Sequence, residues 1–263
     1  MAKTLEIPFK ITSENLLKII NILKDLSVIH DKSLFKFDKN NLLIYSMVGE
    51  GNGINAFKSY TFSIKDIIDI NVDELDVSVD FIAKDIKSIY RNLQIMVDMN
   101  KDITGKLYYD QIGDKYFSDR LFFKVDSKLK LNFYGSDPMS FNTNITINHI
   151  NKLTNIDNSE FSFELKIDDF NNIKKLSLTN KESDVFYLNT FEKDGKYLIS
   201  IGESSWDLIL GDIDKDIIKT LSFPKKYLKI INVDDISKIY VFDRFLMIKS
   251  DNSNLLISTE ITV

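Results

Sequence analysis

Apolar positions along the chain change from a spacing of two residues to a helical spacing and back again, and this change predicts a repeated unit. Residues 4–11 alternate as a β-strand does, whereas residues 14–26 place their apolar side chains three or four residues apart. Ser13 stands before the second segment and is a favourable N-cap. Three further alternating segments predict hairpin-connected strands at residues 33–38, 41–48 and 54–64.

The same order of one strand, one helix and three strands recurs three more times. The tetrapeptide Lys-Ile-Ile-Asn occurs in the first and the last predicted helix, at residues 18–21 and 229–232. A polar stretch at residues 134–158 follows the second copy and is typical of a connector. The helices of the four copies are predicted at residues 14–26, 81–93, 168–179 and 224–233.

The repeats predict an α+β chain of two similar domains, each with two copies of the unit, antiparallel sheets on the outside and helices on an inner face. We expect an N-terminal domain at residues 1–135, a connector at 136–158 and a C-terminal domain at 159–263. The 263 residues are enough for both cores, and 44% of them are hydrophobic.

The composition excludes several classes of protein. The chain has no cysteine, so disulfide bonds and thiolate metal sites are ruled out. No apolar stretch is long enough to span a membrane, and the N-terminal residues lack the apolar run of a signal peptide. We therefore expect a cytoplasmic protein that has no membrane partner.

No group of side chains predicts catalysis, a metal site or a cofactor. His30 and His149 are the only histidines, and each is alone in its segment. The glycine-rich residues 49–53 precede a predicted strand rather than a helix, which favours a hairpin loop over a phosphate-binding loop. We expect a protein that is not an enzyme.

Charge is distributed unevenly along the chain. The whole chain carries −5, whereas the four helical segments, with the third extended to residue 180, together carry +5. One such helix is most simply a solvated surface. Four on one side of the molecule would instead attract the phosphates of DNA, and lysine would contact them without reading the bases.

This organisation resembles that of the DNA sliding clamps, the processivity factors that include PCNA and the T4-type bacteriophage clamps. In that family each domain has two copies of strand–helix–three strands. Residues 223–240 resemble the last helix of PCNA-type clamps and the strand after it, and residues 42–60 resemble the strands that follow the first helix. The spacing of Lys84 and Lys87 resembles a basic pair on the second helix of such clamps.

The resemblance implies a homotrimeric ring whose helices line a central hole. Twelve helices about 10 Å wide leave an opening of about 28 Å, which admits duplex DNA. The implied partners are double-stranded DNA of any sequence, a DNA polymerase and an ATP-dependent clamp loader. The implied DNA-facing residues are Lys18, Lys24, Lys84, Lys87, Arg91, Lys174, Lys175, Lys225, Lys226 and Lys229.

Two further sites are implied by the resemblance alone. One is an apolar pocket beneath the connector for partner peptides, although apolar residues on strands equally predict an ordinary core. Its residues are Met47, Val48, Met139, Phe141, Phe245, Leu246, Ile257 and Ser258. The other site is a subunit interface between residues 128–135 and 205–212 of the next chain, with Lys130, Asn132, Tyr134, Trp206, Leu208 and Leu210.

Departures from PCNA favour a bacteriophage clamp, which would act in the host cytoplasm. The C-terminal residues 254–263 lack the Ala-Pro that follows the last strand of PCNA, and the connector lacks the apolar pattern of the PCNA connector. Two alternatives stay open. Residues 107–125 interleave aromatic and basic side chains and predict a module that binds single-stranded nucleic acid. The other alternative is a β-rich virion or interaction protein with no role at DNA.

Overall fold

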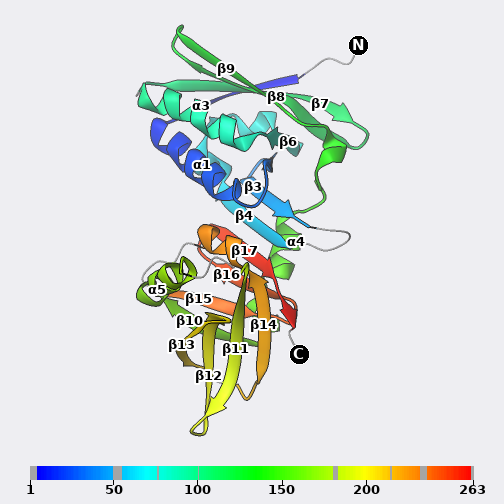
Figure 1. The fold of residues 1–263 in the computed structure, drawn as a ribbon. Helices are drawn as coiled ribbons and strands as arrows, with labels where there is room; N and C mark the ends of the chain where they lie inside the picture. The colour runs from blue at the N-terminus through cyan, green and yellow to red at the C-terminus, as the bar shows by residue number, and fades with distance from the viewer. Residues whose placement is uncertain are drawn as a thin grey trace. The chain divides into compact units, whose positions relative to one another are not determined.

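The computed structural model describes residues 5–49, 55–75, 77–99, 101–179, 183–213, 215–231 and 236–261 (Figure 1). The chain divides into two compact units. Unit 1 contains residues 1–47 and 58–150, and unit 2 contains residues 48–57 and 151–263. Two sequence-based predictions fall outside the described residues, namely the glycine-rich loop at 50–53 and the end of the fourth helix at 232–233.

The first two copies of the predicted unit are present in the expected order. The first copy is β1 (Leu5–Ile11), α1 (Ser13–Leu26), β2 (Lys32–Phe37), β3 (Asn41–Val48) and β4 (Ala56–Ser63). The short elements α2 (Ile64–Ile67), β5 (Asp69–Ile70) and η1 (Val72–Glu74) follow it. The second copy is β6 (Val79–Lys84), α3 (Ile86–Asp98), β7 (Ile103–Ile112), β8 (Lys115–Val125) and β9 (Leu129–Tyr134).

The last two copies follow three short helices, η2 (Pro138–Ser140), α4 (Ile147–Leu153) and η3 (Ile156–Asn158). The third copy is β10 (Phe161–Lys166), α5 (Ile167–Ser177), β11 (Val185–Lys193), β12 (Lys196–Glu203) and β13 (Trp206–Asp212). The fourth is β14 (Lys219–Pro224), η4 (Lys225–Ile230), β15 (Ile236–Val241), β16 (Phe245–Lys249) and β17 (Ser253–Ser258), and β18 (Glu260–Ile261) ends the series. The predicted α+β class and its fourfold repeat are therefore confirmed.

The strand that precedes each helix pairs with the other copy in the same unit. In unit 1, β1 pairs with β7, from Leu5 opposite Tyr109 to Ile11 opposite Ile103, and β6 pairs with β2. In unit 2, β10 pairs with β15, and β14 pairs with β11. The two copies of a unit thus exchange their first strands, and neither copy has a complete sheet of its own.

The exchange gives each unit its sheet order. Unit 1 runs β4-β3-β2-β6-β8-β7-β1-β5, with β9 added to β8. Unit 2 has β10-β15-β16-β17 in one sheet and β13-β12-β11-β14-β18 in another. The strand pairings are antiparallel as expected, with one exception among the described strands: β6 pairs with β8 in parallel. A parallel pair needs a long crossover connection, and α3 together with β7 provides it.

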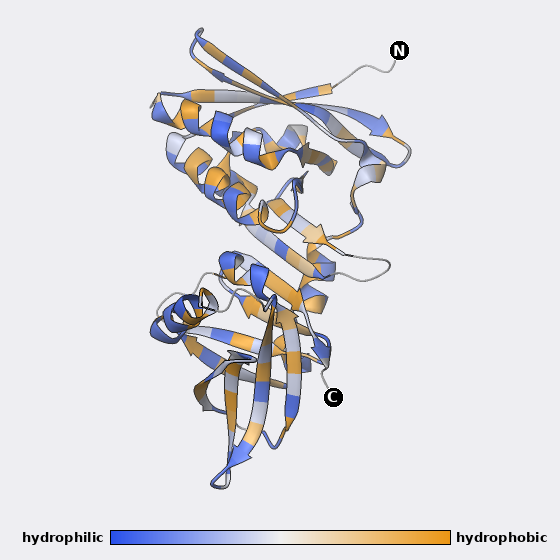
Figure 2. Cartoon of the chain, viewed as in Figure 1, coloured by the Kyte–Doolittle hydropathy of each residue, from blue (hydrophilic) through white to orange (hydrophobic). Residues whose placement is uncertain are grey.

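The helices α1 and α3 lie side by side on one face of the unit 1 sheet (Figure 1). Each helix buries one side against the strands of the unit 1 core. Four of the residues on these sides have no exposed surface, namely Leu16, Ile20, Ile86 and Met96. Figure 2 shows hydrophobic and hydrophilic residues interleaved along both helices. The exposed positions of α1 and α3 therefore point away from the sheet.

Helix starts in unit 1 differ from those predicted. The N-cap of α1 is Thr12 rather than Ser13, and its hydroxyl accepts a hydrogen bond from the N–H of Asn15 at 3.1 Å. Helix α3 begins only at Ile86, because β6 continues to Lys84 in its pairing with β2. Asp85 turns the chain with φ of 50° and caps the helix by accepting from the N–H of Ser88.

The fourth predicted helix is a short 3₁₀ helix instead of an α-helix. Pro224 precedes η4 and offers no side chain to cap it. Tyr227 and Leu228 are buried in unit 2 and hold the segment in place. Packing rather than helical propensity therefore stabilises η4. No helix in the described part of the chain has the length and apolar character needed to cross a membrane.

The β1–β7 pairing has one position where no side chain can be added. A Cβ on Gly105 would lie 2.1 Å from Cζ of Phe9, the residue directly opposite on β1. We predict that Gly105→Ala lowers the free energy of unfolding by about 1–3 kcal/mol, because the Phe9 ring must move within a packed core. Urea unfolding followed by circular dichroism measures the change. Thr104→Ala, at an exposed neighbouring position, is the control, and equal stability of the two variants would contradict the prediction.

Candidate nucleic-acid interface

The exposed sides of α1 and α3 carry most of the basic residues predicted in unit 1. Lys24 lies in the last turn of α1, and Lys87 and Arg91 lie on α3. All three are exposed, and within the described residues none of them forms an ion pair. Lys18 is also exposed but lies 3.1 Å from Glu14 of the same helix, so part of its charge is neutralised. The result is a positive helix surface directed away from the sheet.

Lys84 is exposed but does not belong to a helix. It ends β6, and the left-handed Asp85 separates it from Lys87 in the first turn of α3. The prediction that Lys84 and Lys87 lie on the same helix was therefore wrong. Both amines remain at the surface near the start of α3, because β6 leads directly into the helix cap.

A buried polar cluster fixes the end of α1 and was missed in the sequence. Lys58 of β4 is 2% exposed, and its Nζ lies 3.5 Å from a carboxylate oxygen of Asp25. The hydroxyl of Tyr60 donates to the same carboxylate at 2.8 Å. Burial lowers the pKa of Lys58, while the charge of Asp25 opposes this shift. The signal in the sequence is the one charged residue of β4, whose other side chains are apolar, aromatic or hydroxyl-bearing.

The unit 2 residues predicted to face DNA fall into an exposed set and one exception. Lys174 and Lys175 lie in the last turn of α5, where the helix dipole favours positive charge. The amine of Lys174 lies 4.1 Å from the centre of the Phe170 ring. Lys226 and Lys229 of η4 are exposed as well. These four lysines are available to an anionic partner.

Lys225 is the exception, and its assignment to the DNA-facing set is corrected. Its side chain is only 17% exposed, and its Nζ lies 2.7 Å from Oε1 of Glu203 at the end of β12. The Glu203 side chain is fully enclosed. A buried carboxylate needs a charged partner, so Lys225 holds η4 against β12. The signal in the sequence is the single acid that ends the apolar strand at residues 196–203.

The connector is fastened to unit 1 by polar contacts. Lys36 lies 2.8 Å from the buried carboxylate of Asp80 and also donates to the carbonyl oxygen of Thr143 at 3.4 Å. Lys115 donates to the Asn144 side chain at 2.6 Å. Burial raises the pKa of Asp80, although Lys36 and Lys115 counteract the shift. The sequence holds one signal for this network, which was missed: the acid Asp80 within the apolar strand β6.

The residues predicted for a peptide pocket occupy different environments within each unit. In unit 1, Met139 is 93% exposed, and the ring centre of Phe141 lies 5.7 Å from that of Tyr45. The hydroxyl of Tyr45 donates to the carbonyl oxygen of Asn142 at 2.5 Å, which holds this stretch of the connector on the sheet. Met47, at the end of β3, is half-buried.

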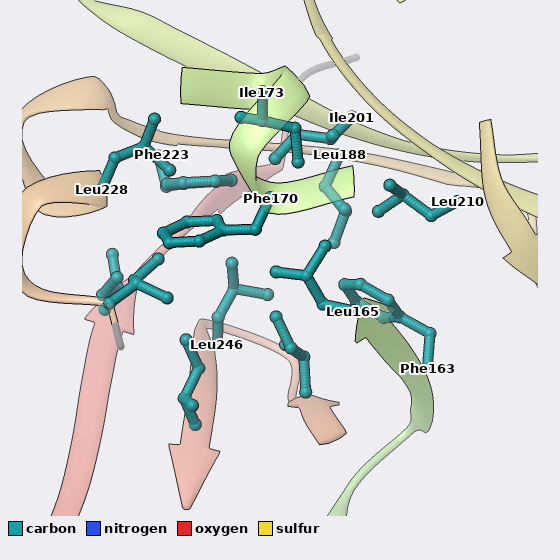
Figure 3. A pocket seen from close by; sticks show the side chains of 14 residues that line it. Phe163, Leu165, Phe170, Ile173, Leu188, Ile201, Leu210, Phe223, Leu228 and Leu246 are labelled. Carbon is teal, nitrogen blue, oxygen red and sulfur yellow. The ribbon is translucent and has the colours of Figure 1, made fainter. Parts of the chain in front are cut away.

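In unit 2, two of the predicted pocket residues are part of the core. Leu246 and Ile257 are 5% and 0% exposed, and they line an apolar cavity of about 20 Å³ together with Phe170 and Phe223 (Figure 3). For these two positions the core interpretation holds. The half-buried members of the set are Val48, Phe245, which stacks on Phe242, and Ser258, whose N–H donates to Asn55.

The strands predicted to join subunits are both at sheet edges. Within the described residues, β9 pairs only with β8, and β13 pairs only with β12. On β9 the exposed residues are Lys130, Asn132 and Tyr134. On β13 the half-buried residues are Trp206, Leu208 and Leu210, and Leu210 lines the unit 2 cavity. Trp206 packs edge-on against Phe186 with ring centres 5.9 Å apart.

Comparison with solved structures gives likenesses that extend over almost the whole chain. The β subunit of DNA polymerase III from Borrelia burgdorferi matches 96% of the chain with a TM-score of 0.65 and 13% identity. PCNA from Entamoeba histolytica matches 99% with a TM-score of 0.60 and 13% identity, and PCNA from A. fulgidus matches 98% with 0.59 and 12%. The chain has the DNA sliding-clamp fold.

The lengths of these sliding clamps differ in an informative way. The chain covers 64% of the Borrelia subunit, just under two thirds, but 100% of the Entamoeba PCNA and 99% of the A. fulgidus PCNA. No protein-family model and no curated protein sequence matches the chain. At 11–13% identity the likeness concerns the arrangement of the backbone, so the roles of individual side chains rest on their own geometry.

The Glu203–Lys225 pair separates a structural lysine from one that faces solvent. We predict that Lys225→Met lowers the free energy of unfolding by about 3–5 kcal/mol, because the enclosed Glu203 loses its partner. Lys226→Met, the neighbouring exposed position, should change it by less than about 0.5 kcal/mol. Thermal and urea unfolding of both variants provide the measurement. A Lys225→Met protein as stable as Lys226→Met would show that the pair contributes no net stability.

Proposed function

We propose that the chain is the subunit of a sliding clamp that encircles duplex DNA and tethers a DNA polymerase during synthesis. The observation that carries the proposal is the paired helices α1 and α3. The strand exchange aligns them on one face of the sheet, and Lys24, Lys87 and Arg91 lie on their exposed side. These positive side chains attract phosphates, and the lysine amines contact them without reading bases, which permits movement along DNA.

We infer that three chains form the ring. The chain matches two PCNA chains over their full length, or nearly so, and bacterial β clamps over about two thirds of theirs. The edge strands β9 and β13 support a closed assembly, because an unpaired edge exposes backbone groups that another chain can bind. In the proposed trimer, β9 of one chain pairs with β13 of the next.

The proposal extends to the partner proteins of the clamp and to its origin. Solved clamps with this fold bind a DNA ligase peptide in Helicobacter pylori and the C-terminal region of FEN-1 in A. fulgidus. We infer a similar peptide contact for a polymerase at the connector, with the exposed Met139 as one contact residue. An ATP-dependent loader would open the ring. The departures from the PCNA sequence favour a bacteriophage clamp that acts as a non-enzymatic scaffold.

The absence of native cysteine allows a direct test of the ring. Asn132→Cys on β9 is combined in separate variants with Asp207→Cys or Ile209→Cys on β13. We predict that oxidation links β9 to β13 between chains and yields a covalent closed trimer on a denaturing gel. When oxidation is carried out with nicked circular DNA, the trimer should stay on the DNA at high salt and leave it after linearisation.

The matched control pairs Asn132→Cys with Lys193→Cys, which lies at the exposed β11–β12 hairpin. This pair should give no closed trimer. Native mass of the unmodified chain adds a second measurement, because the proposal requires assemblies of three 30.5 kDa chains. A stable monomer or dimer at high concentration, with no linked species from any β13 position, would refute the ring.

The helix surface is tested by charge reversal. We predict that Lys87→Glu with Arg91→Glu weakens association with duplex DNA by at least about tenfold and makes its salt dependence shallower. The control is Lys193→Glu with Lys249→Glu, which makes the same charge change at exposed positions of unit 2. Native mass should be the same for both variants. Equal loss of duplex binding in the control would mean that net charge, not this surface, determines binding.

A further inference from the structure

The face of the unit 1 sheet opposite α1 and α3 carries side chains in ordered rows. Residues directly opposite each other in antiparallel strands lie on the same face. One row runs across β9, β8, β7 and β1 through Lys130, Lys124, Thr104 and Lys10. Among the described residues of unit 1, no helix covers this side of these strands in Figure 1. We call it the open face of β9, β8, β7 and β1.

Aromatic rings and an arginine form the neighbouring rows of the open face. In one of them, Tyr134, Arg120 and Tyr108 are consecutive across the strands. The Arg120 guanidinium lies 3.9 Å from the centre of the Tyr108 ring, and Tyr134 is 59% exposed. Phe122 lies two residues from Arg120, between the basic and the aromatic row. Rings and guanidinium planes of this kind are surfaces on which unpaired bases stack.

The charges on the open face favour an anionic partner at its centre. Two acidic side chains, one on β5 and one on β1, lie at its margin. Asp69 is opposite Lys10 at one end, and Glu6 forms an ion pair with Lys106 at 2.9 Å. Lys124 and Arg120 in the middle of the sheet form no ion pair within the described residues. The whole chain carries −5, so it is the local positive potential of this surface, and not the net charge, that attracts phosphate.

We propose that the open face binds single-stranded nucleic acid. The phosphates lie along the lysine row, and the bases stack on Arg120, Phe122 and Tyr134. A duplex keeps its bases stacked inside and would use only the charges, as would an acidic peptide. This site is separate from the helix surface proposed to face duplex DNA. It needs neither a ring nor a loader, so a chain that fails to form a trimer could still confirm it.

The test measures fluorescence anisotropy of a labelled oligothymidylate with the full chain at several salt concentrations. We expect binding that weakens with salt, and Lys10→Glu with Lys124→Glu should weaken it at least about tenfold and reduce the salt dependence. The control, Lys193→Glu with Lys249→Glu, makes the same charge change in unit 2 and should change the affinity for the oligothymidylate less than about twofold. Phe122→Leu should weaken binding at least about fivefold with the salt dependence unchanged, because stacking is lost and charge is kept.

A loss of binding in these variants must be distinguished from a loss of folding. Circular dichroism and thermal unfolding establish that each variant folds, and Tyr134→Leu, at a more exposed position, replaces Phe122→Leu if the latter is unstable. No binding of the oligonucleotide at low salt would overturn the proposal. So would equal loss in the unit 2 control, displacement by an equal concentration of duplex or of polyglutamate, or full affinity in the variants that lack an aromatic ring.

Discussion

The exchange of first strands between two copies of one unit is the interaction on which the structure depends. β1 completes the sheet of the second copy, and β6 completes that of the first. Neither copy can therefore satisfy its backbone hydrogen bonds or cover its apolar face alone. Because each exchanged strand leads into its own helix, the pairing also brings α1 and α3 together on one face of the sheet. The helix surface is a consequence of strand pairing.

The same constraint explains where the other surfaces lie. Both helices lie on one side of the sheet, so the opposite side of β1, β7, β8 and β9 is left to solvent. The side chains on that side are not constrained by packing in the core. The order of strands also leaves β9 and β13 at edges, where β8 and β12 are their only partners among the described strands. One pairing rule thus defines a helix surface, an open sheet face and two edges for assembly.

The sequence was sufficient for the repeat but not for its pairing. Alternation and helical spacing are local patterns, so the order of elements could be read along the chain. Which strand lies beside which depends on contacts distant in sequence, and the parallel β6–β8 pair could not be foreseen. Lys84 was assigned to a helix because apolar Phe81 and Ile82 fit either spacing. Lys225 looked like its basic neighbours, because Glu203, the partner that buries it, is 22 residues away.

The two candidate binding faces of unit 1 differ in a way that bears on movement. None of the exposed positions of α1 and α3 is aromatic, and the lysine amines among them contact phosphates as point charges that do not select a base. Contacts of that kind are exchanged between successive phosphates at little cost, which suits a tether that must slide. The open face adds Tyr134, Phe122 and the Arg120–Tyr108 stack, and stacked bases must separate before a strand can advance. In the two proposals, therefore, the helix surface serves movement on duplex DNA, and the open face serves to hold a single strand.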